Sequence, residues 1–164
     1  MRPIYLILIA LLVLTAVFAA GCSAKPLDGP IALSEFAYYH NGMSSADGYS
    51  FRLSETTDGT LFAFSLNSGA YEAEFTVPNG ALEELGAIAA EHRIDRWDGF
   101  DKVDKNVSDG EGFTLSFTAK DGSTCSAHGS NAFPKGYHEA EEPLLAVFCA
   151  LVAEYAPEYL DYLP

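Results

Sequence analysis

The sequence predicts an α+β fold in which an antiparallel meander sheet carries two helices packed on one face. Three observations lead to this prediction. Apolar and polar residues alternate through several short segments, which is the period of a half-buried strand. Asp-Gly pairs, which favour tight hairpin turns, separate such segments. Two longer segments repeat apolar residues at helical spacing and stand apart from the strands, which disfavours a parallel sheet.

The first half of the domain is expected to form four strands in a meander. Residues 31–40 place Phe36 and Tyr38 on one face, and the period of two continues through the next three segments. The Asp-Gly pair at residues 58–59 supplies the positive φ values that a tight hairpin needs. The residues expected to face the core from these later segments are Tyr49, Phe51, Leu53, Phe62, Phe64, Leu66, Tyr71, Ala73, Phe75 and Val77.

The second half predicts two helices and a further hairpin. Residues 81–93 and residues 141–155 repeat apolar side chains at helical spacing. Residues 113–117 and 123–128 flank a second Asp-Gly pair, so we expect them to pair with each other. A polar loop is expected over residues 101–112. The residues expected to face the core from the helices are Leu82, Leu85, Ile88, Ala89, Leu144, Leu145, Phe148, Leu151 and Val152.

The first 22 residues have the pattern of a bacterial lipoprotein signal. Arg2 gives a positive start, residues 4–18 are an almost uninterrupted apolar run, and small residues precede Cys22. The pattern predicts cleavage before Cys22, acyl chains on that cysteine, and a domain held at the extracytoplasmic face of the cell membrane. An uncleaved membrane span is disfavoured, because a span needs about 20 apolar residues.

These assignments divide the chain into three parts. Residues 1–21 are the predicted signal peptide, residues 22–30 are the lipidated cysteine and a tether, and residues 31–164 are a single globular domain. The tether is expected to be irregular, because it contains two prolines and a glycine among small and polar residues. The remaining length suits one domain with a hydrophobic core of its own.

The chain is strongly acidic, with 9 Lys and Arg residues against 23 Asp and Glu residues and a formal net charge of −14. Among the charged residues, removal of residues 1–21 takes away only Arg2, so the net charge of the mature chain is more negative still. Such a charge repels phosphate backbones and anionic lipid headgroups, which argues against nucleic acid as a partner and against a polybasic membrane contact. Solubility alone is the alternative explanation of the charge. No sequence pattern implies a cofactor.

Two cysteines, Cys125 and Cys149, remain once Cys22 carries lipid. An exported domain permits a disulfide between them. The alternative is a pair of thiols that pack as small apolar side chains. The two lack the CxxC spacing of a redox or zinc site, and the sequence leaves the choice between bridge and thiols open.

Three short motifs form the most unusual local sequence. Residues 97–100 read Trp-Asp-Gly-Phe, residues 109–110 read Asp-Gly, and residues 129–137 contain Gly-Ser-Asn-Ala-Phe-Pro. The series resembles a family of uncharacterised bacterial lipoprotein domains over residues 80–140, and the resemblance implies kinship without a known activity. Candidate ligand-binding residues around these motifs are Trp97, His128, Asn131, Phe133 and Tyr137.

A structural role is the alternative for the same loop. Asn131 would hold the loop by bonding to backbone groups, because asparagine side chains commonly do so in turns. Phe133 and Tyr137 would then cover one end of the core instead of contacting a ligand.

An acidic loop raises the hypothesis of calcium binding. The candidate ligands are Asp104, Asn106, Ser108 and Asp109, and the first three copy the alternating oxygen ligands at the start of an EF-hand. The pattern then fails, because Asp109 stands where that loop needs glycine and Leu115 stands where it needs a bidentate glutamate. A solvated acidic loop is the alternative, and we assign no metal site.

The histidines next to residues 129–137 suggest a second hypothesis, a hydrolase-like enzyme centred on this loop. His128 and His138 flank it and would converge with an acid, with Ser130 and Asn131 between them. No nucleophile elbow accompanies Ser130, so no catalytic residue is assigned.

The leading prediction is a lipid-anchored domain that binds or scaffolds an envelope component without catalysis. Many aromatic residues occur in the first four segments, and those on the outer face of the sheet would form a platform for a glycan or peptide. The expected partners are the membrane, through lipidated Cys22, and an envelope protein, peptide or glycan.

Overall fold

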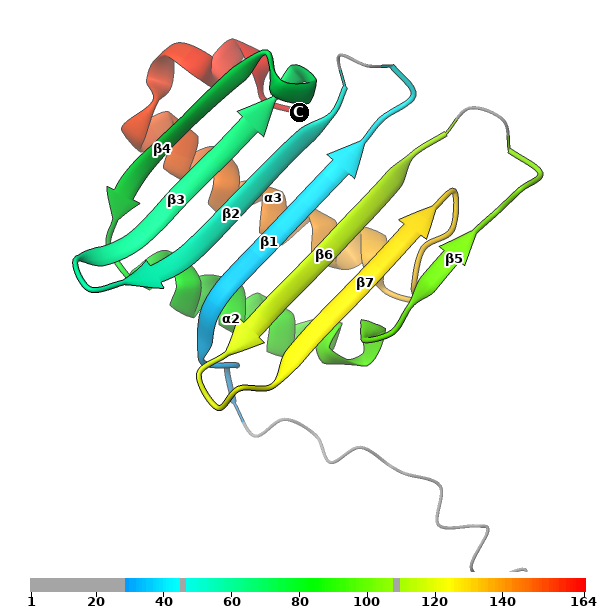
Figure 1. Ribbon diagram of the computed structural model, residues 1–164, viewed down its shortest axis with the longest axis horizontal. Coiled ribbons are helices and arrows are strands. Elements are labelled where there is room, and N and C mark those ends of the chain that lie inside the picture. Colours follow the sequence, from blue (N-terminus) through cyan, green and yellow to red (C-terminus); the bar gives the residue numbers. More distant parts are fainter. Residues whose placement is uncertain (1–28, 45–46, 108–109) are drawn as a thin grey trace, which may run out of the picture.

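The computed structural model of the chain describes residues 29–44, 47–107 and 110–164 (Figure 1). Within this part, seven strands form one sheet in the order β4-β3-β2-β1-β6-β7-β5. All neighbouring pairs are antiparallel except β5 and β7, which are parallel. The strands are β1 (Leu33–Asn41), β2 (Tyr49–Thr56), β3 (Gly59–Leu66), β4 (Tyr71–Val77), β5 (Asp101–Val103), β6 (Gly112–Ala119) and β7 (Thr124–Ser130).

Two main helices, α2 (Gly80–Glu91) and α3 (Tyr137–Tyr155), lie on the same side of the sheet (Figure 1). Three short 3-10 helices connect or follow the larger elements: η1 (Asn67–Gly69), η2 (Ile94–Trp97) and η3 (Pro157–Tyr162). The predicted α+β class and the packing of two helices on one face are therefore confirmed. No helix in the described ranges has both the length and the apolar character to cross a membrane.

The core lies between the sheet and the helices, where the predicted alternation places its apolar side chains. Phe36 of β1 pairs with Leu53 of β2 and Phe117 of β6, so three apolar residues lie side by side across the sheet. Phe148 of α3 stacks on Phe51 with ring centroids 4.5 Å apart. Burial of such side chains away from water is the main source of the stability of the fold.

The meander of β1 to β4 is confirmed, but β1 is not an edge strand. Its other side pairs with β6, so the hairpin of β6 and β7 extends the same sheet. β5 was expected to be part of a loop. It pairs in parallel with β7 through only three positions, Asp101 to Val103, which is too short for a strand pattern to show in the sequence.

The last helix begins earlier than the predicted residue 141. Its N-cap is Gly136, which adopts a φ of +84°, and the N–H of Ala140 donates to the Gly136 carbonyl at 3.2 Å. Tyr137, expected in a loop, is therefore the first residue of α3. Pro143 lies inside the helix, which helix propensity alone does not favour.

The segment that leads into β1 crosses close to α2. The N–H of Ile31 donates to the carbonyl of Gly86 at 3.0 Å. A Cβ atom on Gly86 would lie 2.0 Å from the Ile31 carbonyl oxygen, so this close approach requires glycine.

Both cysteines of the described domain are free thiols, so the disulfide alternative is wrong. Cys125 is buried on β7, and its Sγ donates to the carbonyl of Ile94 at 3.4 Å. Cys149 is partly buried on α3.

Candidate binding face

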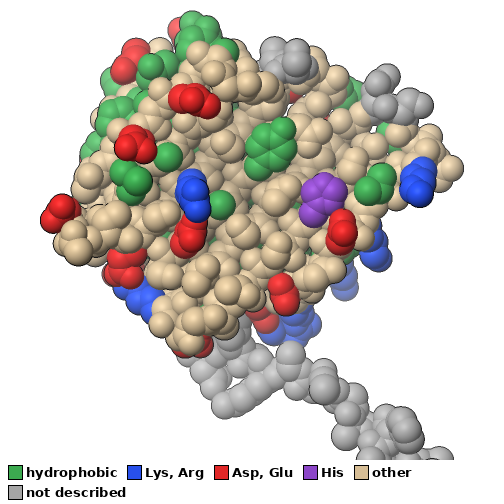
Figure 2. Space-filling view, viewed as in Figure 1, with side chains coloured by type: hydrophobic (Ala, Val, Ile, Leu, Met, Phe, Trp, Pro, Cys, Tyr) green, Lys and Arg blue, Asp and Glu red, His purple; other side chains and the backbone are tan. Residues whose placement is uncertain are grey.

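The face of the sheet opposite α2 and α3 is uncovered among the described residues (Figure 1), and we call it the outer face. Strand alternation places small and hydroxyl-bearing side chains there, and Figure 2 shows polar side chains and backbone over most of its middle. The outer-face residues of the central strands are Glu35, Ala37, Tyr39, Ser50, Arg52, Ser54, Leu61, Ala63, Ser65, Thr114, Ser116, Thr118, Thr124, Ser126 and His128.

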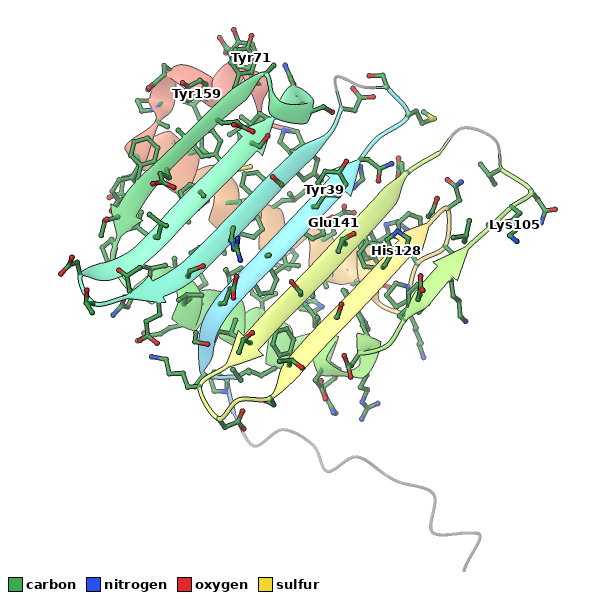
Figure 3. The ribbon with its side chains drawn as sticks, viewed as in Figure 1. Tyr39, Tyr71, Lys105, His128, Glu141 and Tyr159 are labelled. Carbon is green, nitrogen blue, oxygen red and sulfur yellow. The ribbon has the colours of Figure 1, made fainter. Side chains whose placement is uncertain are left out.

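One row of side chains crosses the outer face at right angles to the strands. Tyr39 of β1 lies opposite Ser50 of β2 on one side and Thr114 of β6 on the other. Thr114 lies opposite His128 of β7, which lies beside Asp101 of β5. In the other direction, Ser50 lies opposite Ser65 of β3, which lies opposite Glu72 of β4. We call these seven residues the transverse row: Glu72, Ser65, Ser50, Tyr39, Thr114, His128 and Asp101. Figure 3 labels Tyr39 and His128 on this face.

Two pairs of polar side chains lie on the outer face, one on the central strands and one at the β5 edge. Arg52 donates from Nε to Glu35 at 2.8 Å. The Nδ1 of His128 lies 3.1 Å from a carboxylate oxygen of Asp101, and the two side chains are 49 % and 81 % exposed. Glu72 and Glu74 of β4 add negative charge at the opposite edge. The face therefore offers hydroxyls, paired polar side chains and acidic ends.

Two depressions flank the middle of the outer face. One, of about 420 Å³, is lined on the β2 to β4 side by residues that include Arg52, Ser65 and Glu72. The other, of about 490 Å³, is lined on the β7 side by His128, Asp101 and neighbouring residues of the segment 98–100. Tyr39, whose side chain is 45 % exposed, stands on β1 between the strands that bear the two depressions.

The predicted Trp-Asp-Gly-Phe motif has a structural role. Trp97 is 4 % exposed and contacts Phe113 and Tyr137, so it is a core residue. The carboxylate of Asp98 accepts from the N–H of Ser126 at 2.9 Å. The motif therefore holds the residues that lead into β5 next to β7, through the hydrogen bond of Asp98.

Most of residues 129–137 also take the structural role. Asn131 adopts a φ of +54°, and its Nδ2 approaches the carbonyl of Val107 at 3.4 Å. Phe133 stacks on Phe113, the ring of Tyr137 packs against Phe113 at a tilt, and the two cover that end of the core. A Cβ on Gly129 would lie 2.0 Å from the carbonyl oxygen of Ala132, so glycine permits the loop to fold back on β7.

The histidines expected to converge on this loop lie on opposite sides of the sheet. His128 is on the outer face with Asp101, whereas His138 is on α3 and contacts Phe133. Nδ1 of His138 lies 3.6 Å from the carboxylate of Glu141. The expectation that both histidines join one acid around Ser130 and Asn131 is therefore wrong, because alternation along β7 points His128 away from the helices.

A buried polar cluster, which the sequence did not predict, joins the sheet to α3. The hydroxyls of Tyr38 and Tyr137 lie 2.6 Å apart, and they donate to the same Glu141 oxygen at 2.8 Å and 3.0 Å. Nδ1 of His40 is 3.6 Å from that oxygen and has no hydrogen-bond partner within the described residues. The two tyrosine hydroxyls carry two hydrogens for these three oxygen–oxygen contacts, so the hydrogens are shared among the contacts.

The environment of this cluster keeps its tyrosines neutral. Burial first, and then the neighbouring Tyr137, raise the pKa of Tyr38 far above its ordinary value. Burial also raises the pKa of Tyr137, to which the charge of Glu141 adds. The pKa of Tyr49, whose ring stacks on that of His40, is raised by burial and by Glu141.

The EF-hand-like stretch is only partly described. An oxygen of Asp104 accepts from the N–H and Nδ2 of Asn106, each at 2.9 Å, which closes a local turn. Ser108 and Asp109 lie outside the described residues. Within the described ranges, His, Cys, Asp and Glu side chains form no group of three or more that would hold a metal ion. Calcium binding stays a prediction.

No protein-family model matches the chain, and no curated protein sequence matches it either. Kinship with a family of bacterial lipoprotein domains therefore stays a prediction.

The sequence predicted an aromatic platform on the outer face without assigning its residues, and Tyr39, Arg52 and Asp101 were not among the assigned candidates. Alternation in residues 31–40 puts Tyr39 on the other face of the strand from Phe36 and Tyr38, which indicates that Tyr39 faces outward. No sequence signal gives the order of the strands. The row formed by Tyr39, Thr114 and His128 follows from the pairing of β1 with β6, which the sequence does not reveal.

Proposed function

We propose that the chain is a lipid-anchored, extracytoplasmic domain that binds or scaffolds an envelope component through the outer face of its sheet. Cys22 holds it to the cell membrane, and the outer face contacts the partner. Catalysis has no part in this function.

The anchor is supported by the sequence of residues 1–22, which lies outside the described residues. A short positive start, an apolar run and small residues before a cysteine are what a lipoprotein signal requires. Several acyl chains on one cysteine would anchor the domain firmly, because each buried methylene contributes roughly 0.8 kcal/mol.

The binding face is supported by one observation: the transverse row places an exposed tyrosine in the middle of an uncovered sheet face. Antiparallel sheets often leave one face to water, and polar side chains alone would serve that purpose. Tyr39 instead exposes a large apolar ring between two depressions, and exposed aromatic side chains rimmed by polar groups are typical of recognition surfaces.

The anchor is tested with Cys22→Ala. Cells that express the full chain are labelled with a palmitate analogue, and membranes are separated from soluble material. We expect label and membrane attachment in the wild type and neither in the variant. Equal membrane attachment of the variant would contradict lipidation.

The binding face is tested by placing a photoreactive phenylalanine analogue at position 39 or at position 162 of the full chain. Tyr39 and Tyr162 are similarly exposed, at 45 % and 40 %, but only Tyr39 is on the outer face. Illumination of cells should give adducts at position 39 and few at position 162. Equal yields at both positions would contradict a specific outer-face contact.

A hydrolase-like activity is the second candidate, and one observation favours it. Glu141 lies within 3.6 Å of two histidines and accepts from two tyrosine hydroxyls beside residues 129–137. Ester, peptide and glycoside panels test it. Turnover that disappears in Glu141→Gln while the variant remains folded would support this candidate over the binding function.

A further inference from the structure

We infer that the outer face binds a linear, non-anionic polysaccharide that lies across the strands, with one sugar ring stacked on Tyr39. This inference rests on the proposed function, because it names the chemical class of the partner that the outer face takes.

Tyr39 has the surroundings that a sugar-stacking aromatic needs. Its neighbours across the sheet, Ser50 and Thr114, carry small side chains, and the ring contacts no other aromatic ring in the described part of the chain. The ring therefore stays open to a flat ligand. The C–H face of a pyranose ring covers such a surface through apolar area, while its hydroxyls stay at the rim.

The rest of the transverse row supplies hydrogen bonds at the same level as the ring. Ser50, Ser65 and Thr114 carry hydroxyls that both donate and accept, and His128 and Asp101 form a polar pair at one end. Sugar hydroxyls likewise both donate and accept. Every residue of the transverse row can form a hydrogen bond, which suits a ligand that carries hydroxyls along its whole length.

The length and direction of the row indicate a chain and not a single sugar. From Ser65 on β3 to His128 on β7 the row crosses five neighbouring strands. Neighbouring strands lie about 4.8 Å apart, so the row spans roughly 19 Å. The two depressions lie toward the ends of this path, where they provide space for rings that turn out of the plane of the sheet.

The composition of the face argues against a protein partner. Stable protein interfaces centre on a cluster of buried apolar and aromatic side chains. The middle of the outer face offers one exposed aromatic ring, Tyr39, among hydroxyls and small side chains such as Ala37 and Ala63. A peptide that extends the sheet would pair with an edge strand and leave the outer face uncovered.

The charge of the face and of the chain decides which polysaccharides fit. Glu72 and Glu74 stand at one end of the path, and Asp98 and Asp101 stand at the other. Together with a net charge of −14, these carboxylates repel anionic sugars and accept neutral or amine-bearing ones.

The test measures binding of the full chain in detergent to chitohexaose, cellohexaose and mannohexaose by calorimetry, with a hyaluronan hexasaccharide as the anionic control. At least one neutral hexasaccharide should bind, and the hyaluronan fragment should not. Tyr39→Ala should weaken binding about ten-fold or more, because truncation removes the stacking surface. Tyr162→Ala, a matched exposed tyrosine elsewhere, should leave binding unchanged.

Two results would overturn the inference: no binding of any neutral hexasaccharide, or equal weakening by Tyr39→Ala and Tyr162→Ala. The proposed function is judged separately. If photo-crosslinking at position 39 gives protein adducts while the sugars fail to bind, the outer face is a binding face for another class of partner and the polysaccharide inference alone is wrong. If both measurements fail, the proposed function is also wrong.

Discussion

The hydroxyl of Tyr38 lies 2.6 Å from the hydroxyl of Tyr137, which joins a central strand of the sheet to the first residue of α3. Both hydroxyls also lie within hydrogen-bond distance of one Glu141 oxygen, one turn further along the helix. Because buried polar groups stabilise a fold only when they are hydrogen-bonded, this contact fixes where the start of α3 sits on the sheet.

Removal of one hydroxyl should therefore cost stability. We expect Tyr38→Phe to lower the free energy of unfolding by about 1–2 kcal/mol, because Tyr137 and Glu141 lose a buried partner. Tyr39→Phe is the matched control. Tyr39 is exposed, so its hydroxyl should contribute close to nothing to the free energy of unfolding. Urea unfolding of the full chain measures both. Equal stability of the two variants would show that the cluster does not hold the helix.

Stability should fall at alkaline pH. The pKa values of Tyr38, Tyr49 and Tyr137 are raised in the folded state, chiefly by burial. Above pH 10 the unfolded chain releases these protons while the folded chain keeps them. The stabilising contribution is therefore complete below about pH 10 and is lost above it, by about 1.4 kcal/mol per pH unit for each tyrosine.

Urea unfolding between pH 8 and pH 11.5 checks this expectation. Tyr38→Phe should reduce the alkaline slope, because one of the three groups is gone. A slope that stays the same in the variant would contradict the assignment of Tyr38 to a neutral buried state.

The close approach of Ile31 to α2 makes a prediction about glycine. Alanine is the better helix former, yet Gly86→Ala should destabilise the fold by about 1–3 kcal/mol, because its Cβ would collide with the Ile31 carbonyl. Gly80→Ala is the control in the same helix, where a Cβ meets nothing within 4 Å. That variant should be neutral or slightly more stable in thermal unfolding. If Gly86→Ala and Gly80→Ala both stabilised the protein, the close approach of Ile31 to α2 would be contradicted.

The two thiols should differ in reactivity. Burial, with the charges of Asp98 and Asp95, raises the pKa of Cys125 to about 12, so its reactive thiolate is scarce at pH 8. Cys149 is less enclosed, although burial raises its pKa too. Iodoacetamide followed by peptide mass spectrometry should modify Cys149 first and Cys125 only after unfolding. Equal rates in the native protein would contradict the burial of Cys125.

The fold was predictable because local signals suffice for its parts. The alternation around Phe36, Phe62 and Phe117 gave the strands and their inner faces, and helical spacing gave the buried side of α2. The early start of α3 was missed because it depends on the backbone of Gly136 after the loop. β5 was missed because three residues carry no period.

The site was much less predictable, because it depends on which strands are neighbours. His128 was a candidate from its position near residues 129–137, but its partner Asp101 comes from the short parallel strand. Tyr39 and Thr114 become neighbours only because β1 pairs with β6, across 75 residues of sequence. Likewise, Tyr38 and Glu141 meet only when α3 packs on the sheet.

The central claim is that the outer face is occupied outside the cytoplasm, and cysteine accessibility tests it most directly. Thr114→Cys places a thiol in the transverse row, and Glu142→Cys places one on an exposed position of α3. Because Cys149 is also a free thiol, labelling of the introduced cysteine is read by peptide mass spectrometry. A membrane-impermeant maleimide should label the introduced cysteine of both variants of the full chain in detergent. In cells with outer layers permeable to the reagent, it should label only Glu142→Cys. Equal labelling of Thr114→Cys in cells and in detergent would contradict an occupied outer face, and failure of Glu142→Cys to label in cells would contradict the extracytoplasmic location.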